Sequence, residues 1–152
     1  MTVDEIREPG PEPTATLIVR QAPLSGATVT REDVPSTIDE LPLVALLGCF
    51  AEGETVVEGA AELRAKESDR IAGIVDGLSA LGAEIETQPD GFAVRGTGGL
   101  RGGMLDARGD HRLAMLGAIA GLASQEGVEV EGFESVAVSY PRFERDLRSL
   151  LG

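Results

Sequence analysis

Two short polar stretches of the sequence carry side chains suited to binding an anion and moving a proton. LRAKESDRIA contains Lys66, the only lysine, with Glu67 and Arg70. GDHRLA contains His111, the only histidine, followed by Arg112. Ammonium and guanidinium groups bind carboxylates and phosphates, and a carboxylate beside them can accept or donate a proton. The two stretches therefore predict a site for an anionic substrate.

Both stretches precede apolar segments with helical periodicity, so helix amino termini are expected to position them. IDELPLVALLGCFAEG and GDHRLAMLGAIAGLASQEG predict two helices that start beside Asp39 and Asp110. Residues 66–82 and 139–152 predict a second pair of helices. Helix starts present unpaired N–H groups and the positive end of the helix dipole, which favours bound anions. We therefore expect the polar clusters to form one anion site.

Helical spacing assigns different positions to the charges of the first stretch. On a helix that begins at Lys66, Lys66 and Arg70 share one face, whereas Glu67 lies toward the apolar stripe that includes Ile71. Burial and nearby cations act on such a carboxylate in opposite directions, which makes Glu67 a candidate acid or base. Asp39 is the second candidate.

Purely structural interpretations of these residues stay open at this point. Asp39 and Asp110 also fit the role of helix caps, and Glu67 fits a surface ion pair. His111 fits an ordinary position at a helix start. The only lysine, the only histidine and two arginines all lie at the predicted helix starts. This concentration favours one binding site over separate structural roles.

The predicted elements occur in the same order twice. LIVRQAPLSGATV and FAVRGTGGLRGGML each predict two short strands, and each is followed by an apolar helix, a strand (ETVVEG or VEVEG) and a further helix. AEIET adds a strand between the copies. We expect residues 1–13 to be an extended or disordered arm, 14–87 a first repeat unit and 88–152 a second, in an α/β (α+β) fold.

Composition narrows the class of protein. The net charge of −13, with 26 acidic residues against 13 lysines and arginines, argues against nucleic acid and acidic membranes as partners and favours adaptation to concentrated salt. No apolar run is long enough to span a membrane, and the start of the sequence is acidic, so a cytoplasmic location is expected. The single cysteine, Cys49, is expected in the core and excludes an internal disulfide.

Four stretches together closely resemble the carboxy-terminal part of the EPSP synthase family: TIDELPLVALLGCFAEGETVVEGAAEL, LRAKESDRIAGIVDGLSALGAEIE, GDHRLAMLGAIAGLAS and SYPRFERDL. The resemblance covers about residues 14–152. It implies a two-lobed enolpyruvyl transferase fold, with tandem βαβαββ-like units in each lobe. It also implies that this chain is a fragment holding an incomplete lobe, with the remaining lobe as its partner.

The resemblance implies transfer of the enolpyruvyl group of phosphoenolpyruvate to the 5-hydroxyl of shikimate 3-phosphate, in chorismate and aromatic amino acid biosynthesis, without metal or organic cofactor. It assigns substrate binding to four residues and proton transfer to two: Lys66, Arg70, His111 and Arg112, and Asp39 and Glu67. In this assignment Arg70 and Arg112 clamp phosphoenolpyruvate near His111, and Lys66 contacts shikimate 3-phosphate. The isolated chain is expected to lack appreciable turnover, because closure of two lobes assembles such a site.

One departure and two alternatives accompany the resemblance. Many family members carry a lysine beside the aromatic-proline pair, but Val138 and Ser139 precede Tyr140 and Pro141 here. A related transferase with a UDP-N-acetylglucosamine acceptor is the first alternative, although KESDR with DHR fits the shikimate enzyme better. A non-catalytic repeat module, in which the clusters are caps and surface pairs, is the second.

Overall fold

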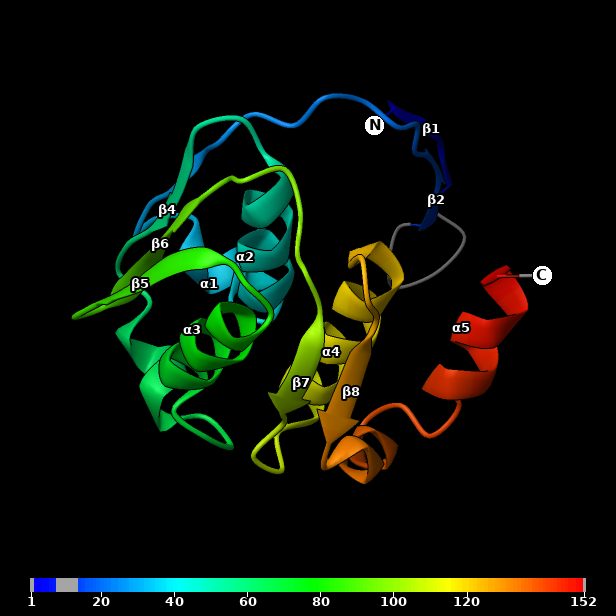
Figure 1. The fold of residues 1–152 in the computed structure, drawn as a ribbon. Coiled ribbons are helices and arrows are strands. Elements are labelled where there is room, and N and C mark those ends of the chain that lie inside the picture. Colours follow the sequence, from blue (N-terminus) through cyan, green and yellow to red (C-terminus); the bar gives the residue numbers. More distant parts are fainter. Residues whose placement is uncertain (1, 8–13, 152) are drawn as a thin grey trace.

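The fold is a mixed α/β structure in which helices pack against small sheets (Figure 1). The computed structural model describes residues 2–7 and 14–151. In this part of the chain there are three sheets, five α-helices and two 3-10 helices, η1 and η2. The α/β expectation is confirmed.

The largest sheet has the strand order β3-β4-β6-β5. Its strands are β3 (Thr28–Val29), β4 (Glu54–Val57), β6 (Gly91–Arg95) and β5 (Glu84–Gln88). β3 pairs with β4 in parallel, whereas β6 pairs antiparallel with both β4 and β5. β6 therefore joins the sheet of the first repeat unit, although the sequence division at residues 87 and 88 assigns it to the second.

Four helical segments alternate with these strands along the chain: α1 (Val34–Thr37) and α2 (Leu41–Phe50) lie between β3 and β4, and η1 (Ala61–Ala65) and α3 (Arg70–Ala80) lie between β4 and β5. α2 packs on β4 and β6, and α3 packs on β5, β6 and β7. These contacts bring the buried face of each helix onto a sheet, as the apolar periodicity requires.

The second half of the chain repeats the order β3-α2-β4-η1-α3 of the first. Its elements are β7 (Gly103–Asp106), α4 (His111–Ala123), β8 (Val128–Glu131), η2 (Phe133–Val138) and α5 (Phe143–Leu151). β7 and β8 pair in parallel, as β3 and β4 do. The repeated order agrees with the two units expected from the sequence, while their boundaries stay a prediction.

The start of the chain forms a separate two-stranded sheet. β1 (Thr2–Arg7) pairs antiparallel with β2 (Thr14–Ile18). Residues 19–27 run from β2 across to β3, and the small sheet lies apart from the other two (Figure 1). Within the arm expected over residues 1–13, residues 2–7 are thus an extended strand, and residues 8–13 lie outside the described part of the chain.

The helices begin later than the sequence predicts. The helix expected over 66–82 starts at Arg70, because η1 occupies the residues before Lys66 and Asp69 caps α3 by accepting a hydrogen bond from the Ala72 amide at 3.0 Å. The helix expected from Ser139 starts at Phe143, because η2 runs to Val138. In both units a 3-10 helix ends just before the expected helix start, and residues 66–69 and 139–142 form non-helical bends and turns where the first helical turn is expected.

One apolar core joins the helices and the sheets. Phe92 and Val94 of β6, Ile74 of α3 and Leu113 of α4 are fully buried members of this core. Cys49 belongs to it as expected: burial raises the pKa of its thiol to about 11, and the thiol donates to the Ala45 carbonyl at 3.4 Å. Cys49 is therefore a packing residue.

Apolar side chains also remain at the surface. α2 is apolar nearly all round, yet it is buried on one face only, because Leu43 and Leu47 are exposed. Of the described residues of α5, none is buried, and Leu150 is exposed.

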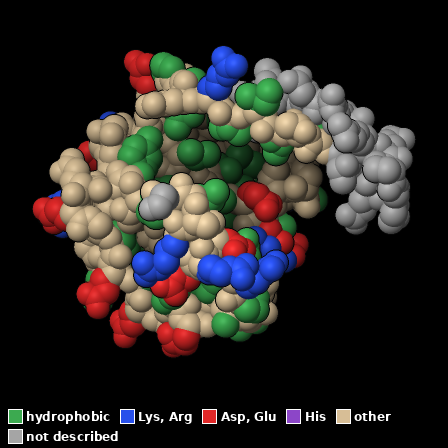
Figure 2. Space-filling model, turned by 90° about the vertical axis from the view of Figure 1, so that its right-hand side faces the viewer, with side chains coloured by type: hydrophobic (Ala, Val, Ile, Leu, Met, Phe, Trp, Pro, Cys, Tyr) green, Lys and Arg blue, Asp and Glu red, His purple; other side chains and the backbone are tan. Residues whose placement is uncertain are grey.

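Figure 2 shows a hollow lined by hydrophobic side chains, with charged side chains gathered below it. No helix in residues 2–7 and 14–151 has the length and apolar character needed to cross a bilayer.

Candidate active site

Three helix starts meet at one place and supply the charged side chains of the site. Asp39 lies in the turn between α1 and α2, Arg70 is the first residue of α3, and Arg112 is in the first turn of α4. α2, α3 and α4 pack against one another in pairs. The packing of these helices brings together residues separated by as many as 73 positions.

Arg70 is the centre of this cluster, with only 1% of its side chain exposed. Its Nε donates to Asp110 Oδ2 at 2.9 Å, and its Nη2 donates to the carboxylate of Glu67. Its Nη1 lies 3.5 Å from Asp39 Oδ1 but is buried without a hydrogen-bond partner among the described residues. A buried guanidinium N–H without a partner is unusual and marks a position where a ligand atom could accept a hydrogen bond.

Asp39 bridges the two arginines that the sequence predicts as substrate-binding residues. Its Oδ2 lies 2.9 Å from Arg112 Nη2, and its backbone carbonyl accepts from Arg112 Nη1 at 3.1 Å. Its Oδ1 faces Arg70. Since one carboxylate spans both guanidinium groups, Arg70 and Arg112 are placed to hold one small anion together; we call this pair the arginine clamp.

Asp110 is fully buried and connects the starts of α3 and α4. As the amino-terminal cap of α4 it accepts from the Arg112 amide at 2.9 Å, and it also accepts from Ser68 Oγ at 3.1 Å and from Arg70. Burial raises the pKa of this carboxyl, but the hydrogen bonds from Arg70, the Arg112 amide and Ser68, with the positive charge of Arg70, outweigh burial. The pKa of Asp110 therefore lies below its ordinary value.

Glu67 takes part in the cluster, but in a different position from the predicted one. It precedes α3 rather than lying on the apolar stripe of the helix, and half of its side chain is exposed. The reason is the late start of the helix at Arg70. Glu67 pairs with Arg70, so it is near the clamp and is free to turn toward solvent.

Lys66 lies outside the cluster of ion pairs. It follows η1, and its ammonium group pairs with Glu62 of that 3-10 helix at 2.6 Å. The expected alignment of Lys66 and Arg70 on one helix face is wrong, because Lys66 is not part of α3. Its assignment to substrate binding stays a prediction.

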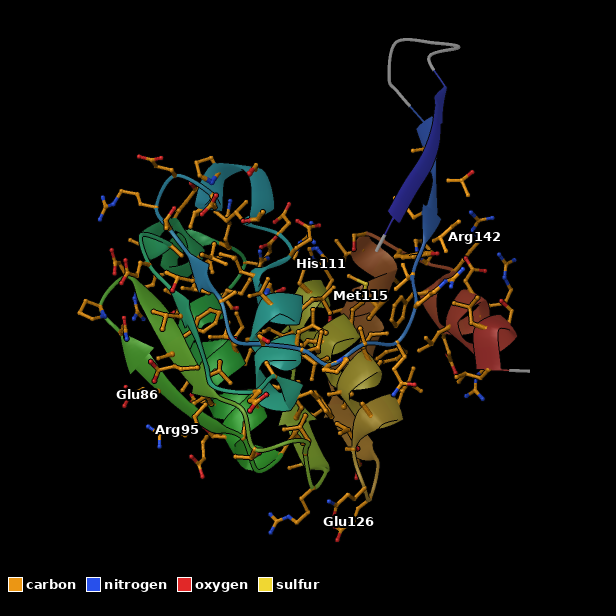
Figure 3. The ribbon with its side chains drawn as sticks, turned by 90° about the horizontal axis from the view of Figure 1, so that it is seen from above. Glu86, Arg95, His111, Met115, Glu126 and Arg142 are labelled. Atoms are coloured by element: carbon orange, nitrogen blue, oxygen red, sulfur yellow. The ribbon has the colours of Figure 1, made fainter. Side chains whose placement is uncertain are left out.

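His111 is the first residue of α4 and is partly buried. Figure 3 shows His111 and Met115 on the same side of α4, one turn apart. Arg95 and Arg142 lie toward opposite sides of the molecule, away from His111 (Figure 3). These two arginines therefore do not add to the positive charge at the helix starts.

The cluster can bind an anion only if its own carboxylates give way. Asp39 and Glu67 already neutralise the arginine clamp, and both are about half exposed. Displacement of these two carboxylates would free guanidinium donors for a phosphate or carboxylate ligand and leave two potential proton-transfer groups beside it. Within the described residues, no group of three or more His, Cys, Asp and Glu side chains is arranged to hold a metal ion.

Sequence reasoning missed two members of the site. For Asp110 the sequence indicates only a helix cap, and for Ser68 it indicates no role. The signal for Asp110 is its equivalence to Asp39 in the repeat, together with the need of a buried arginine for a buried carboxylate. No local pattern indicates Ser68, whose hydroxyl reaches a residue 42 positions away.

One known protein family matches most of the chain. The family model for EPSP synthase, 3-phosphoshikimate 1-carboxyvinyltransferase, matches residues 5–147. The chain belongs to the EPSP synthase family. A family member from Thermotoga sp. (strain RQ2), named 3-phosphoshikimate 1-carboxyvinyltransferase, is 56% identical over 140 residues, which are 91% of this chain and 33% of the relative. One from Persephonella marina is 45% identical over 147 residues, 96% of this chain and 34% of the relative.

Solved structures show the same family fold. EPSP synthase from Acinetobacter baumannii superposes with a TM-score of 0.89 at 38% identity, over 95% of this chain and 34% of that one. The enolpyruvyl transferase NikO from Streptomyces tendae shares the fold, with a TM-score of 0.70 at 24% identity, over 98% of this chain and 32% of that one. The chain thus spans about a third of the length of the EPSP synthases it matches.

Proposed function

We propose that this chain forms part of an enzyme that transfers the enolpyruvyl group from phosphoenolpyruvate to the 5-hydroxyl of shikimate 3-phosphate and releases phosphate. The observation that carries the proposal is the arginine clamp, in which Arg70 and Arg112 face one carboxylate, Asp39. Membership of the EPSP synthase family supports the same reaction. The remaining lobe of the enzyme and both substrates are the partners in this proposal, and its location is cytoplasmic.

The proposed chemistry uses the cluster in two ways. Arg70 and Arg112 bind the anionic groups of phosphoenolpyruvate, with His111 near them at the start of α4, and Lys66 contacts shikimate 3-phosphate. Asp39 and Glu67, once displaced from the arginines, serve the proton transfers: the attacking hydroxyl loses a proton and the alkene carbon gains one. The chain alone lacks turnover in this proposal, because groups from the other lobe complete the site.

The proposal predicts a preformed half-site in this chain. Phosphoenolpyruvate titrated into the folded chain should cause saturable amide shifts centred on Glu67, Arg70, His111 and Arg112, followed by NMR. The affinity should fall at higher salt, because charge–charge attraction contributes to binding. A folded chain without saturable shifts would contradict a preformed half-site.

Two arginine variants separate a ligand clamp from structural ion pairs. Arg112→Ala should abolish the shifts and change the free energy of unfolding little, because its pair with Asp39 is partly exposed, whereas a structural role for Arg112 would cost about 1 kcal/mol. Arg108→Ala is the matched control: Arg108 pairs with Asp76 at 2.6 Å on the surface. Equal loss of phosphoenolpyruvate binding in both variants would show that the general loss of positive charge, rather than loss of a clamp, weakens binding.

A further inference from the structure

We propose that Asp110 is a positioning residue that sets the geometry of the arginine clamp. It holds Arg70 through the Nε edge of the guanidinium group and fixes the start of α3 against the start of α4. This inference deepens the proposed function and rests on it. Asp110 touches no substrate in this proposal, and it acts through Arg70 and the backbone of Arg112.

The contacts of Asp110 connect both halves of the clamp. Oδ2 accepts from Arg70 Nε at 2.9 Å and from Ser68 Oγ at 3.1 Å, while Oδ1 accepts from the Arg112 amide at 2.9 Å and faces Arg70 Nη2 at 3.4 Å. A single carboxylate thus determines the orientation of the Arg70 side chain and the place of the residue that bears the second guanidinium. Removal of the Asp110 carboxylate therefore changes the distance between the guanidinium groups of Arg70 and Arg112.

Exposure divides the three carboxylates around Arg70 into two kinds. Asp110 is completely buried, whereas 44% of the Asp39 side chain and 50% of the Glu67 side chain are exposed. Exposed carboxylates exchange an ion pair for water at little cost, but a buried one does not, because no water replaces its partners. An anion can therefore displace Asp39 and Glu67 while Asp110 keeps the Nε edge, which leaves the Nη edge of Arg70 for the ligand.

The hydrogen bonding of Arg70 agrees with this division of the carboxylates into buried and exposed. Nη1 is buried without a hydrogen-bond partner among the described residues, while the Nε edge on the other side of the group is paired with Asp110. Rigid support of a binding group by a partner behind it is a general way to fix the geometry of a site, and loss of such a partner commonly costs about tenfold or more in affinity.

The test compares two capping aspartates in the full chain. Asp110→Asn keeps an oxygen for the helix cap but removes the charged partner of Arg70. Asp69→Asn is the matched control, because Asp69 caps α3 and its carboxylate pairs with Arg64 at 2.9 Å rather than with either arginine of the clamp. The readouts are the order of the Arg70 Nε–Hε group in ¹⁵N relaxation and the affinity for phosphoenolpyruvate.

Asp110→Asn should make the Arg70 Nε–Hε group mobile and lower the phosphoenolpyruvate affinity by about tenfold, with both readouts unchanged in Asp69→Asn. A variant that keeps an ordered Arg70 and wild-type affinity overturns the proposal and leaves Asp110 a structural cap. If Asp110→Asn does not fold, Ser68→Ala replaces it as the test and should increase the mobility of the Arg70 Nε–Hε group. An unchanged mobility in Ser68→Ala also overturns the proposal.

The two readouts separate this inference from the proposed function. A wild-type chain that does not bind phosphoenolpyruvate counts against the preformed half-site, while Arg70 order in the variants still decides the role of Asp110. Conversely, binding that is unaffected by Asp110→Asn supports the half-site and overturns the positioning role.

Discussion

Single residues at the site differ in what their surroundings permit. Asp110 is a buried carboxylate with four donor atoms around it, whereas Asp39 and Glu67 have solvent on one side. The first is held in the charged state and stays in place; the other two can change partners during binding. The same chemical group, a carboxylate, therefore has a structural task in one position and a proposed chemical task in the other two.

The lowered pKa of Asp110 predicts a pH-dependent contribution to stability. A carboxyl whose folded pKa is depressed stabilises the protein above its unfolded pKa of about 3.9, and this stabilisation is lost as the pH falls through the folded pKa. In denaturant unfolding, the difference in free energy between wild type and Asp110→Asn should be largest near about pH 6 and should narrow toward about pH 3.

The control for this experiment is Asp76→Asn, which removes one negative charge from an exposed pair with Arg108. Its free energy of unfolding should differ little from that of the wild type across the same pH range, because exposed pairs contribute little. A difference in free energy of unfolding between wild type and Asp110→Asn that stays constant with pH would show that the charge of Asp110 does not stabilise the fold.

At the scale of elements, close packing between α3 and α4 determines where the clamp residues stand. Gly73 of α3 allows this approach: a Cβ added there would meet Leu113 Cδ1 at 2.3 Å, and Leu113 is fully buried. Arg70 and Arg112 are each within one turn of this contact. A shift of either helix therefore alters the separation of the two guanidinium groups.

Gly73→Ala should destabilise the protein by about 1–2 kcal/mol, because the cost of overpacking exceeds the gain in helix propensity. It should also weaken phosphoenolpyruvate binding. Thermal or denaturant unfolding measures the first effect and NMR titration the second. Gly121→Ala on α4 is the control: its nearest neighbour would be Val128 Cβ at 3.4 Å, so the substitution should be neutral or stabilising. Equal destabilisation of both variants would contradict a special contact at Gly73.

For the whole molecule, the excess of acidic residues sets the response to salt. A net charge of −13 implies self-repulsion in the compact state, which salt screens because the Debye length falls from about 10 Å at 0.1 M to about 3 Å at 1 M. The ion pairs of the site act in the opposite direction but are partly buried and less screened.

The free energy of unfolding at neutral pH should therefore rise between about 0.1 M and 1 M KCl. Chemical denaturation with urea, which adds no charge, measures it. The same comparison near the isoelectric point of about 4.4 is the control, since the net charge is then close to zero and the benefit of salt should disappear. A flat or falling stability at neutral pH would contradict salt adaptation.

Much of the local structure could be predicted from the sequence. The strands expected over ETVVEG, AEIET and VEVEG are present, as β4, β5 and β8, and Asp110 caps its helix. These features depend on residues a few positions apart: alternating apolar side chains in a strand, or an aspartate whose oxygen reaches the next free amide. Helix starts were less predictable, because the 3-10 turns η1 and η2 carry no clear pattern.

By itself, the sequence determined the kinds of charged groups, their position near helix starts and the resemblance to the EPSP synthase family. Only the tertiary structure decided which of these groups meet. It placed Arg70 against Asp110, 40 positions away, and Arg112 against Asp39, 73 positions away, and it left Lys66 with Glu62. The reason is that caps and periodicity act within one or two helical turns, whereas ion pairs between helices depend on how α2, α3 and α4 bury their apolar faces together.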